Sequence, residues 1–342
     1  MTAVVAVNAA NRSAQTWKRY LAPFTRLEFA ISDAAGGITA AVGQLARDRR
    51  DAPAAATLEH GLDVFHTTME AKRVLTLSWR RAEAAWEAAE AADLVVARTK
   101  RQGVDARGVA KTAFNSWKPA IASLRHVERL AAAWDRAHAA LDLFDPTGRL
   151  NTRARAEAEI ALALKDLTGP EWSKVRNFLN DPRSLNFLDR MHRRLESAEP
   201  RGDWRDAMAW RWWLRHRRSS TSDPRISVVR SIGRDGSLSP EEQASYERVE
   251  SVLKDTFRAS SAVECMNSVL RMQQSRHKTM SQPMLNLKRL YWNCHRFDSG
   301  PRKGVSPYQR LGLALPTFDF WALLQIDPKE LTQTLSTSQK TD

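Results

Sequence analysis

The sequence predicts a mainly α-helical protein with a small α/β part near the N-terminus. Three observations predict this fold class. Short apolar runs at residues 27–32 and 58–65 have the length of buried strands. From His66 to about residue 257, apolar side chains recur mainly at helical spacing. Within that stretch, two heptad-like segments separated by Gly103 indicate a long helical hairpin.

The α/β part comes first along the chain. Residues 27–32 predict a strand that ends at Asp33, and Gly36-Gly37 then opens an Ala-rich helix to about residue 47. Residues 58–65 predict a second strand, which is followed directly by the helical part of the chain.

The hairpin is predicted from two apolar seams. The first helix covers about residues 67–100, and its seam has spacings of four and three at Leu75, Trp79, Ala82, Trp86 and Ala89. The second helix covers about residues 107–144, and its seam comprises Leu124, Val127, Leu130, Trp134, Ala137, Leu141 and Phe144. We expect both seams, including the ring of Trp86, to be buried between the helices.

Shorter helices are predicted after the hairpin, near residues 151–167, 170–180, 183–197 and 203–217. A polar linker follows around residues 219–238, and Ser239-Pro240-Glu241-Glu242 is a strong start for a helix to about residue 257. Further helices are expected at 262–273 and 281–294, and a disordered tail after residue 329. The predicted domains are residues 1–66, 67–238 and 239–313, with a tail at 314–342.

The charge of the chain points to a polyanionic partner. The chain has 53 Lys and Arg against 39 Asp and Glu, a formal net charge of +14. Residues 201–234 carry a net +6 and residues 271–303 a net +7, so two windows hold nearly all of the excess. GC-rich codon usage is an alternative source of Arg, but uniform codon bias would not concentrate net charge in this way. We therefore expect nucleic acid as the partner.

Composition excludes several other classes of protein. No run of about 18 apolar residues exists, so we expect no membrane span. Two cysteines, Cys265 and Cys294, cannot build a disulfide framework or a four-Cys zinc site, which indicates a reducing compartment and a cytoplasmic protein.

Several of the 12 tryptophans lie beside arginine. Trp210, Trp212 and Trp213 alternate with the basic residues of the 201–234 window. Aromatic rings in such a setting can stack on unpaired bases, whereas packing in the core is the alternative reading and the one we favour for the tryptophans as a group.

Three motifs near the C-terminus carry a resemblance. Residues 259–271 contain Ser261-x-x-Glu264-x-x-Asn267-x-x-Leu270-Arg271, and Trp292-Asn293-Cys294-His295 follows. The third motif is Arg302-Lys303-Gly304-Val305-Ser306-Pro307-Tyr308. In this order they resemble bacterial insertion-sequence transposases of the DDE type. The strand end at Ile31-Ser32-Asp33 and the segment Asp63-Val64-Phe65-His66 are similar to the second catalytic Asp and to the Cys/Asp-x-x-His motif of Mutator-like elements.

The resemblance implies a fold and a set of site residues. It implies an RNase H-like core, incomplete here, interrupted by a large helical insertion that contains the hairpin. It makes Asp33 and Glu264 the catalytic carboxylates and metal ligands, with Asp63, His66 and Asn267 in support. Alternatives stay open: Asp33 as a cap of the following helix, Glu264 as a solvent-facing acid, and Asp63 with His66 as a structural pair.

The resemblance also implies a reaction and partners. Phosphodiester cleavage and strand transfer in such proteins use two divalent cations, Mg²⁺ or Mn²⁺. DNA, both element ends and target, is the implied partner, in the bacterial nucleoid, and a homo-oligomer or a full-length transposase is a further one. We expect DNA contacts from the residues of the two basic windows, among them Arg211, Arg215, Arg217, Arg218, Arg271, Arg276, Lys278, Arg302 and Lys303.

One part of the family's triad has no counterpart here. Residues 1–32 contain no Asp and a single Glu, Glu28, so the first Asp of the triad is missing. We therefore expect an N-terminally truncated and catalytically inactive transposase. Two other classes remain as alternatives: a non-catalytic nucleic-acid-binding protein, and a helical scaffold that oligomerises through its Trp-rich hairpin.

Overall fold

The described residues of the computed structural model are 11–50, 57–216, 238–256, 258, 281–296, 298, 303–310, 313, 315–327 and 329–330. The chain divides into two compact units, one of residues 13–261 and one that combines residues 1–12 with residues 262–342. The described part is mainly helical, which confirms the coarse fold class. The RNase H-like core and the four-part domain division stay predictions.

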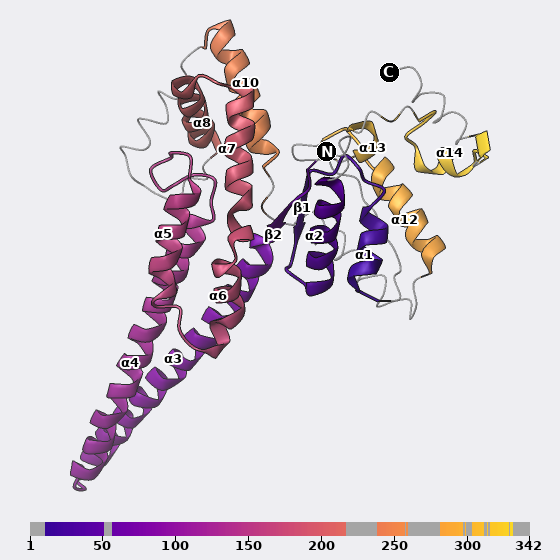
Figure 1. The fold of residues 1–342 in the computed structure, drawn as a ribbon. Coiled ribbons are helices and arrows are strands. Elements are labelled where there is room, and N and C mark those ends of the chain that lie inside the picture. Colours follow the sequence, from indigo (N-terminus) through magenta and orange to yellow (C-terminus); the bar gives the residue numbers. More distant parts are fainter. Residues whose placement is uncertain are drawn as a thin grey trace. The chain divides into compact units, whose positions relative to one another are not determined.

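A small α/β part lies in the larger unit (Figure 1). Strands β1 (Phe29–Ser32) and β2 (Glu59–Leu62) pair in parallel, with Ser32 opposite Leu62. Helix α2 (Gly36–Arg50) connects them, because parallel neighbours need a crossover connection. Both strands are shorter than the sequence predicts: β1 begins only at Phe29, and β2 ends at Leu62 because Asp63 already caps the next helix.

Helix α2 holds this α/β part together. Its Val42 and Leu45 pack against Leu58 in a small apolar cluster. Helix α1 (Ala14–Leu21) packs against α2. Near the end of α2, the Arg49 guanidinium donates hydrogen bonds of 2.6 and 2.8 Å to the carbonyl oxygens of Leu27 and Phe24, which fixes the chain between α1 and β1.

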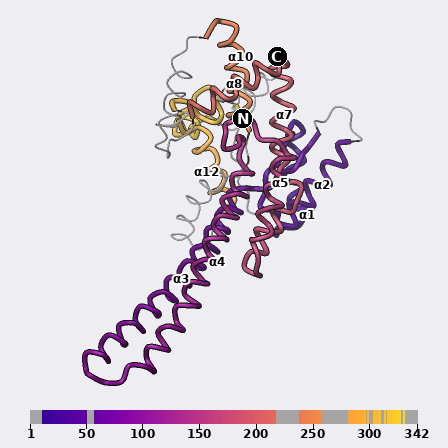
Figure 2. The backbone as a smooth tube through the Cα atoms, turned by 90° about the vertical axis from the view of Figure 1, so that its left-hand side faces the viewer, coloured from indigo at the N-terminus to yellow at the C-terminus, as the bar shows by residue number. Residues whose placement is uncertain are grey.

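Helices α3 (Val64–Arg101) and α4 (Arg107–Ala140) form the predicted hairpin. Figure 2 shows the two running side by side to a tight connection at their far end. Gly103 has a φ of +72° in that connection, a left-handed conformation that glycine adopts without strain. Helix α4 ends at Ala140 rather than near residue 144, and Phe144 instead forms an isolated antiparallel bridge with Leu150.

The buried seam of the hairpin differs from the predicted one on α3. Ala82 and Ala89 are buried as expected, and on α4 Ala113 and Ala120, also seven residues apart, are buried as well. Trp79, however, is exposed, and Trp86 is only half-buried. Small side chains let the two helices approach closely, and this leaves the indoles at the edge of the seam. The second predicted seam is buried from Val127 to Phe144, although Leu141 and Phe144 lie beyond the end of α4.

The rest of the larger unit packs around the base of the hairpin as a series of short helices. They bury one continuous apolar core that also includes Leu62 of β2 and Val64 of α3. Their bounds follow the predicted ranges closely: α5 (Arg153–Leu164), η1 (Pro170–Trp172), α6 (Ser173–Asn180), η2 (Pro182–Leu185), α7 (Asn186–Ala198), α8 (Gly202–His216) and α10 (Pro240–Lys254).

A buried carboxylate ties α7 to α10. Glu199 accepts hydrogen bonds from Arg201 Nε at 2.8 Å, from Ser245 Oγ at 2.6 Å and from Arg248 Nη2 at 2.6 Å. The bonds from Arg201 are the largest cause that holds the pKa of Glu199 far below its ordinary value, so this side chain stays ionised at any physiological pH. Because the charge is fully paired, its burial is tolerated.

The smaller unit contains three described helices, α12 (Gln282–Cys294), α13 (Pro307–Arg310) and α14 (Phe320–Leu324). Tyr291 of α12 meets Phe320 of α14 edge to face, with ring centroids 5.3 Å apart. The predicted linker at 219–238 falls almost entirely outside the described residues, and so do the helix at 262–273 and nearly all of the tail. No helix in the described part of the chain combines the length and apolar character needed to cross a bilayer.

Candidate functional site

Asp33 follows directly on strand β1. Its Oδ1 accepts a hydrogen bond of 3.2 Å from the backbone N–H of Ala35, and the side chain is exposed. The intervening Ala34 has a φ of +63°, a left-handed conformation that is uncommon for a residue with a Cβ. The alternative of Asp33 as a cap of α2 is met only in part, because its bond goes to the residue before that helix begins. The loop therefore holds Asp33 at the surface.

Asp63 follows directly on strand β2, and it is 1% exposed. It caps helix α3, because its Oδ1 accepts the backbone N–H of Phe65 at 2.8 Å. Its Oδ2 lies 2.8 Å from Nδ1 of His66, in the first turn of the same helix. The carboxylate can only accept, so Nδ1 carries the proton and the imidazole ring is held in one orientation.

The parallel pairing brings these two strand ends together. Ser32 and Leu62 are opposite each other, so Asp33 and Asp63 both leave the sheet at its C-terminal edge. The backbone N–H of Asp63 also donates to the carbonyl oxygen of Ser32 at 2.9 Å. In α/β sheets, ligands bind beyond the carboxyl ends of the strands. This edge, with His66 beside it, is the candidate functional site.

His60 of β2 belongs to the same region, although no metal-ligand spacing in the sequence singles it out. Its Nε2 lies 2.8 Å from Ser32 Oγ, and its Nδ1 lies 3.2 Å from Nη1 of Arg183. Since a guanidinium only donates, Nδ1 accepts and Nε2–H donates to Ser32. Burial lowers the pKa of His60 to about 4, and the charge of Arg183 lowers it further against the opposing effect of Asp181. His60 is thus neutral at pH 7.

We expect this neutral histidine to make the larger unit less stable in mild acid. Below pH 6.5 the unfolded chain binds a proton at His60 that the folded chain resists down to about pH 4. The contribution of neutral His60 to the free energy of unfolding is therefore fully present above pH 6.5, and it is lost as the pH falls toward 4. After allowance for solvent screening, the loss should be about 2 kcal/mol.

The measurement is urea unfolding at several pH values, for the wild type and for His60→Asn. His138 also has a lowered pKa, mainly through burial, so the wild-type slope alone does not isolate His60. The difference between the two proteins does. If both lose stability in parallel between pH 6.5 and 4, the assignment of the pH dependence to His60 is wrong.

Only one of the two acids at this edge is suited to bind a metal ion. Asp33 offers an exposed carboxylate with one oxygen bonded to Ala35, which suits a hard cation that takes oxygen ligands. Asp63 does not, because it is buried and both of its oxygens already accept hydrogen bonds. Among the residues that the structure describes, no three His, Cys, Asp or Glu lie close enough to hold a metal ion. Glu264 and Asn267 lie outside the described residues.

The predicted DNA contacts are described only in part. On α8, Arg211 is half-buried, whereas Arg215 is exposed and its guanidinium lies 5.0 Å from the ring centroid of Tyr246. Lys303 is exposed. The other predicted contacts lie outside the described residues: Arg217, Arg218, Arg271, Arg276, Lys278 and Arg302.

The three tryptophans of α8 divide between the two interpretations, packing in the core and stacking on unpaired bases. Trp212 stacks on Phe144, with centroids 5.7 Å apart, and packs against the main core. Trp213 lies against Gly148, where an added Cβ would come within 2.6 Å of its ring. Both side chains therefore have packing roles. Trp210 is exposed, and it is the one of the three whose position suits a base contact.

Comparison of the chain with protein-family models, with curated proteins and with solved structures finds no match. The transposase resemblance therefore rests on the sequence motifs.

Proposed function

We propose that this chain functions as part of a DDE-type transposase, with DNA as its partner. The observation that carries the proposal is the placement of Asp33 and Asp63 at the carboxyl ends of two neighbouring parallel strands. These are the two acids that the sequence motifs select at this end of the chain. An exposed carboxylate on a loop and a histidine held in one orientation, both at the carboxyl edge of the same sheet, are a plausible setting for phosphodiester chemistry.

Each residue has a separate role in this proposal. Asp33 and Glu264 would hold Mg²⁺ or Mn²⁺, and the metal would supply activation of a water or a 3′-hydroxyl group. Asp63 is a positioning residue, because its oxygens cap α3 and orient the ring of His66. His66, 43% exposed at its side chain, faces the site from the first turn of α3 and can bind or relay a proton there.

The proposal is tested by metal binding without any turnover. Loss of the free Mn²⁺ signal in electron paramagnetic resonance measures the affinity of the full chain. Asp33→Asn and Glu264→Gln each keep the shape of the side chain and remove its charge, and each should weaken binding by at least about tenfold. Asp48→Asn is the matched control: this acid is also exposed, on α2 of the same unit, and pairs with Lys18 at 2.6 Å.

The outcomes separate the candidate functions. Equal Mn²⁺ affinity in the wild type, Asp33→Asn and the control means that Asp33 is no ligand, and the proposal fails. A chain that binds no Mn²⁺ but binds DNA in a salt-dependent way is the non-catalytic nucleic-acid-binding protein that the sequence leaves as an alternative.

A further inference from the structure

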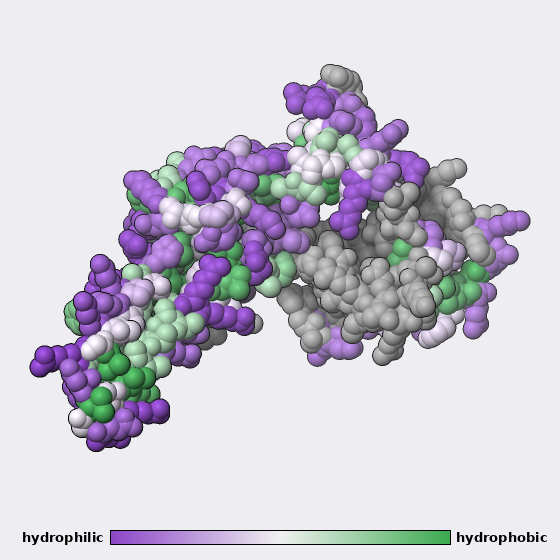
Figure 3. All heavy atoms as spheres, turned by 90° about the horizontal axis from the view of Figure 1, so that it is seen from below, coloured by the Kyte–Doolittle hydropathy of each residue, from purple (hydrophilic) through white to green (hydrophobic). Residues whose placement is uncertain are grey.

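The far half of the α3–α4 hairpin carries apolar side chains on its surface. Phe114 is 79% exposed and Leu94 is 59% exposed, and Ile121 is exposed as well. Figure 3 shows apolar residues gathered toward the end of the hairpin on the face seen from below. A contiguous exposed apolar surface on a soluble protein commonly marks an interaction site.

These side chains share one face with the two half-buried tryptophans. Phe114, Trp117 and Ile121 follow one another at spacings of three and four along α4, so they form one stripe. Trp117 meets Trp86 of α3 edge to face, with centroids 4.8 Å apart. We call the surface formed by Trp86, Leu94, Phe114, Trp117 and Ile121 the aromatic face.

Hydrogen bonds hold the indoles of the aromatic face in place. Trp86 Nε1 donates to Glu90 at 2.9 Å, and Trp117 Nε1 donates across the hairpin to Asp93 at 2.8 Å. The polar ends of both rings are thus satisfied within the chain. A partner would meet rigid rings that lose little conformational entropy on binding.

Charge is segregated along the same stretch. Residues 82–97 of α3 contain four acids, Glu83, Glu87, Glu90 and Asp93, and no Lys or Arg. Residues 98–112, which form the hairpin tip, contain five basic residues against the single acid Asp105: Arg98, Lys100, Arg101, Arg107 and Lys111. Residues 113–126 of α4, which run beside this part of α3, add Lys118 and Arg125 and no acid. The hairpin therefore has a tip with a net charge of +4 next to a middle with a net charge of −2.

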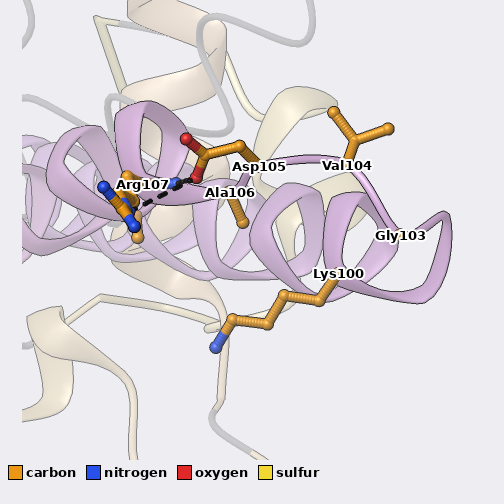
Figure 4. A pocket seen from close by; sticks show the side chains of 7 residues that line it. Lys100, Gly103, Val104, Asp105, Ala106 and Arg107 are labelled. Carbon is orange, nitrogen blue, oxygen red and sulfur yellow. Dashed lines mark hydrogen bonds and ion pairs between the residues drawn. The ribbon is translucent and has the colours of Figure 1, made fainter.

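The tip is also hollowed. An open hollow of about 490 Å³ is lined by Lys100, residues 103–107 and Ala110. Figure 4 shows the side chains around it. Asp105 Oδ1 accepts the backbone N–H of Arg107 at 3.0 Å and lies 3.8 Å from Nε of the same residue, a loose ion pair between two largely exposed side chains. Ala110 stands one turn before Phe114, so the hollow continues the aromatic face toward the tip.

We propose that the aromatic face binds a second copy of this chain, with the two hairpins antiparallel and the basic tip of each on the acidic middle of the other. A two-fold axis between tip and middle satisfies both charge contacts at once, since the same patch serves both copies. The acids in the middle disfavour a nucleic acid on this face, because a phosphate backbone would be repelled there.

The expected dimer is weak. An overlap over residues 82–101 is about 30 Å long at 1.5 Å per residue, and a helix pair is about 20 Å wide. Each copy then buries roughly 600 Å², or about 1,200 Å² in total, which is at the lower limit for a specific interface. We expect a reversible dimer at micromolar concentration.

Sedimentation equilibrium of the full chain tests the interface. The wild type should pass from monomer to dimer as its concentration rises from about 1 to 100 μM, and Phe114→Glu should stay monomeric over that range, a loss of at least about tenfold in affinity. Val95→Glu is the matched control. Val95 is also exposed, but nine residues beyond Trp86 it lies on the opposite side of α3.

Charge substitutions test the arrangement. Arg101→Glu with Arg107→Glu brings the tip from a net charge of +4 to 0, and Glu83→Lys with Glu87→Lys brings the middle from −2 to +2. Either double variant alone should weaken the dimer, because its tip and middle no longer attract each other. An equimolar mixture of the two should recover part of the affinity, because the heterodimer keeps one contact between an unchanged tip and an unchanged middle. The quadruple variant should stay as weak as the double variants, since neither of its contacts is attractive. Circular dichroism melting checks that each variant stays folded.

Three results overturn the proposal. The first is a wild type that stays monomeric throughout the range. The second is a dimer that Phe114→Glu leaves as strong as Val95→Glu does. The third is a tip variant, Arg101→Glu with Arg107→Glu, that changes DNA affinity and not self-association, which would mean that this surface binds nucleic acid.

Discussion

Binding of the full chain to duplex DNA is expected to weaken about a thousandfold when salt rises from 50 to 200 mM, as for roughly six neutralised phosphates. The cause is the net +13 held by residues 201–234 and 271–303, against +14 for the whole chain. Each Lys or Arg that meets a phosphate releases condensed counterions, and added salt opposes that release. Fluorescence anisotropy with a labelled duplex measures the slope of affinity against salt.

A pair of adjacent arginines localises this effect. Arg217→Gln with Arg218→Gln removes two charges from the first basic window, and it should lower the salt slope by about two. Arg80→Gln with Arg81→Gln removes two exposed charges from α3, outside both windows, and should leave the slope unchanged. A constant affinity across the salt range, or equal losses in the two double variants, would contradict DNA binding through these windows.

The features that sequence predicted correctly are those set by near neighbours. The helix start at Ser239 is an example: Ser239 Oγ accepts the N–H of Glu242 at 3.3 Å, and the Glu242 carboxylate accepts the N–H of Ser239 at 2.8 Å. Both partners lie within four residues, so the pattern alone specifies the cap. The hairpin is similar, because its two helices are joined by a short Gly-containing connection.

The features that the sequence could not predict depend on distant contacts. The register of α3 is one, since spacing selects large residues such as Trp79 while close packing buries Ala82 and Ala89. His60 is another, because the lowering of its pKa depends on burial and on Arg183, which is 123 residues away. Asp33 and Asp63 were singled out by resemblance, but their common edge follows from a strand pairing that no local signal encodes.

The same limit applies to the tryptophans, because their spacing along the sequence does not predict which of them are buried. Trp172 of η1 is 0% exposed and lies in the main core of the larger unit, with residues of α4, α6 and α7 in the same cluster. Trp210, in contrast, is exposed on α8. Substitution of each residue by alanine therefore compares the stability contribution of a buried tryptophan with that of an exposed one.

Trp172→Ala is expected to lower the free energy of unfolding of the larger unit by about 3–5 kcal/mol, because it leaves a cavity that the surrounding helices cannot fill. Trp210→Ala should cost less than about 1 kcal/mol, since most surface substitutions have small effects. Urea unfolding followed by circular dichroism gives both values, with the transition of the larger unit fitted separately from that of the smaller one.

Trp172→Phe distinguishes volume from hydrogen bonding. Among the described residues, the buried Trp172 Nε1–H has no hydrogen-bond partner, so the indole carries an unsatisfied donor into the core. Phenylalanine loses part of the ring but also removes that donor, and the two effects oppose each other. We expect a loss below about 1.5 kcal/mol. A Phe variant as unstable as the Ala variant would mean that the N–H group is satisfied after all and contributes to the fold.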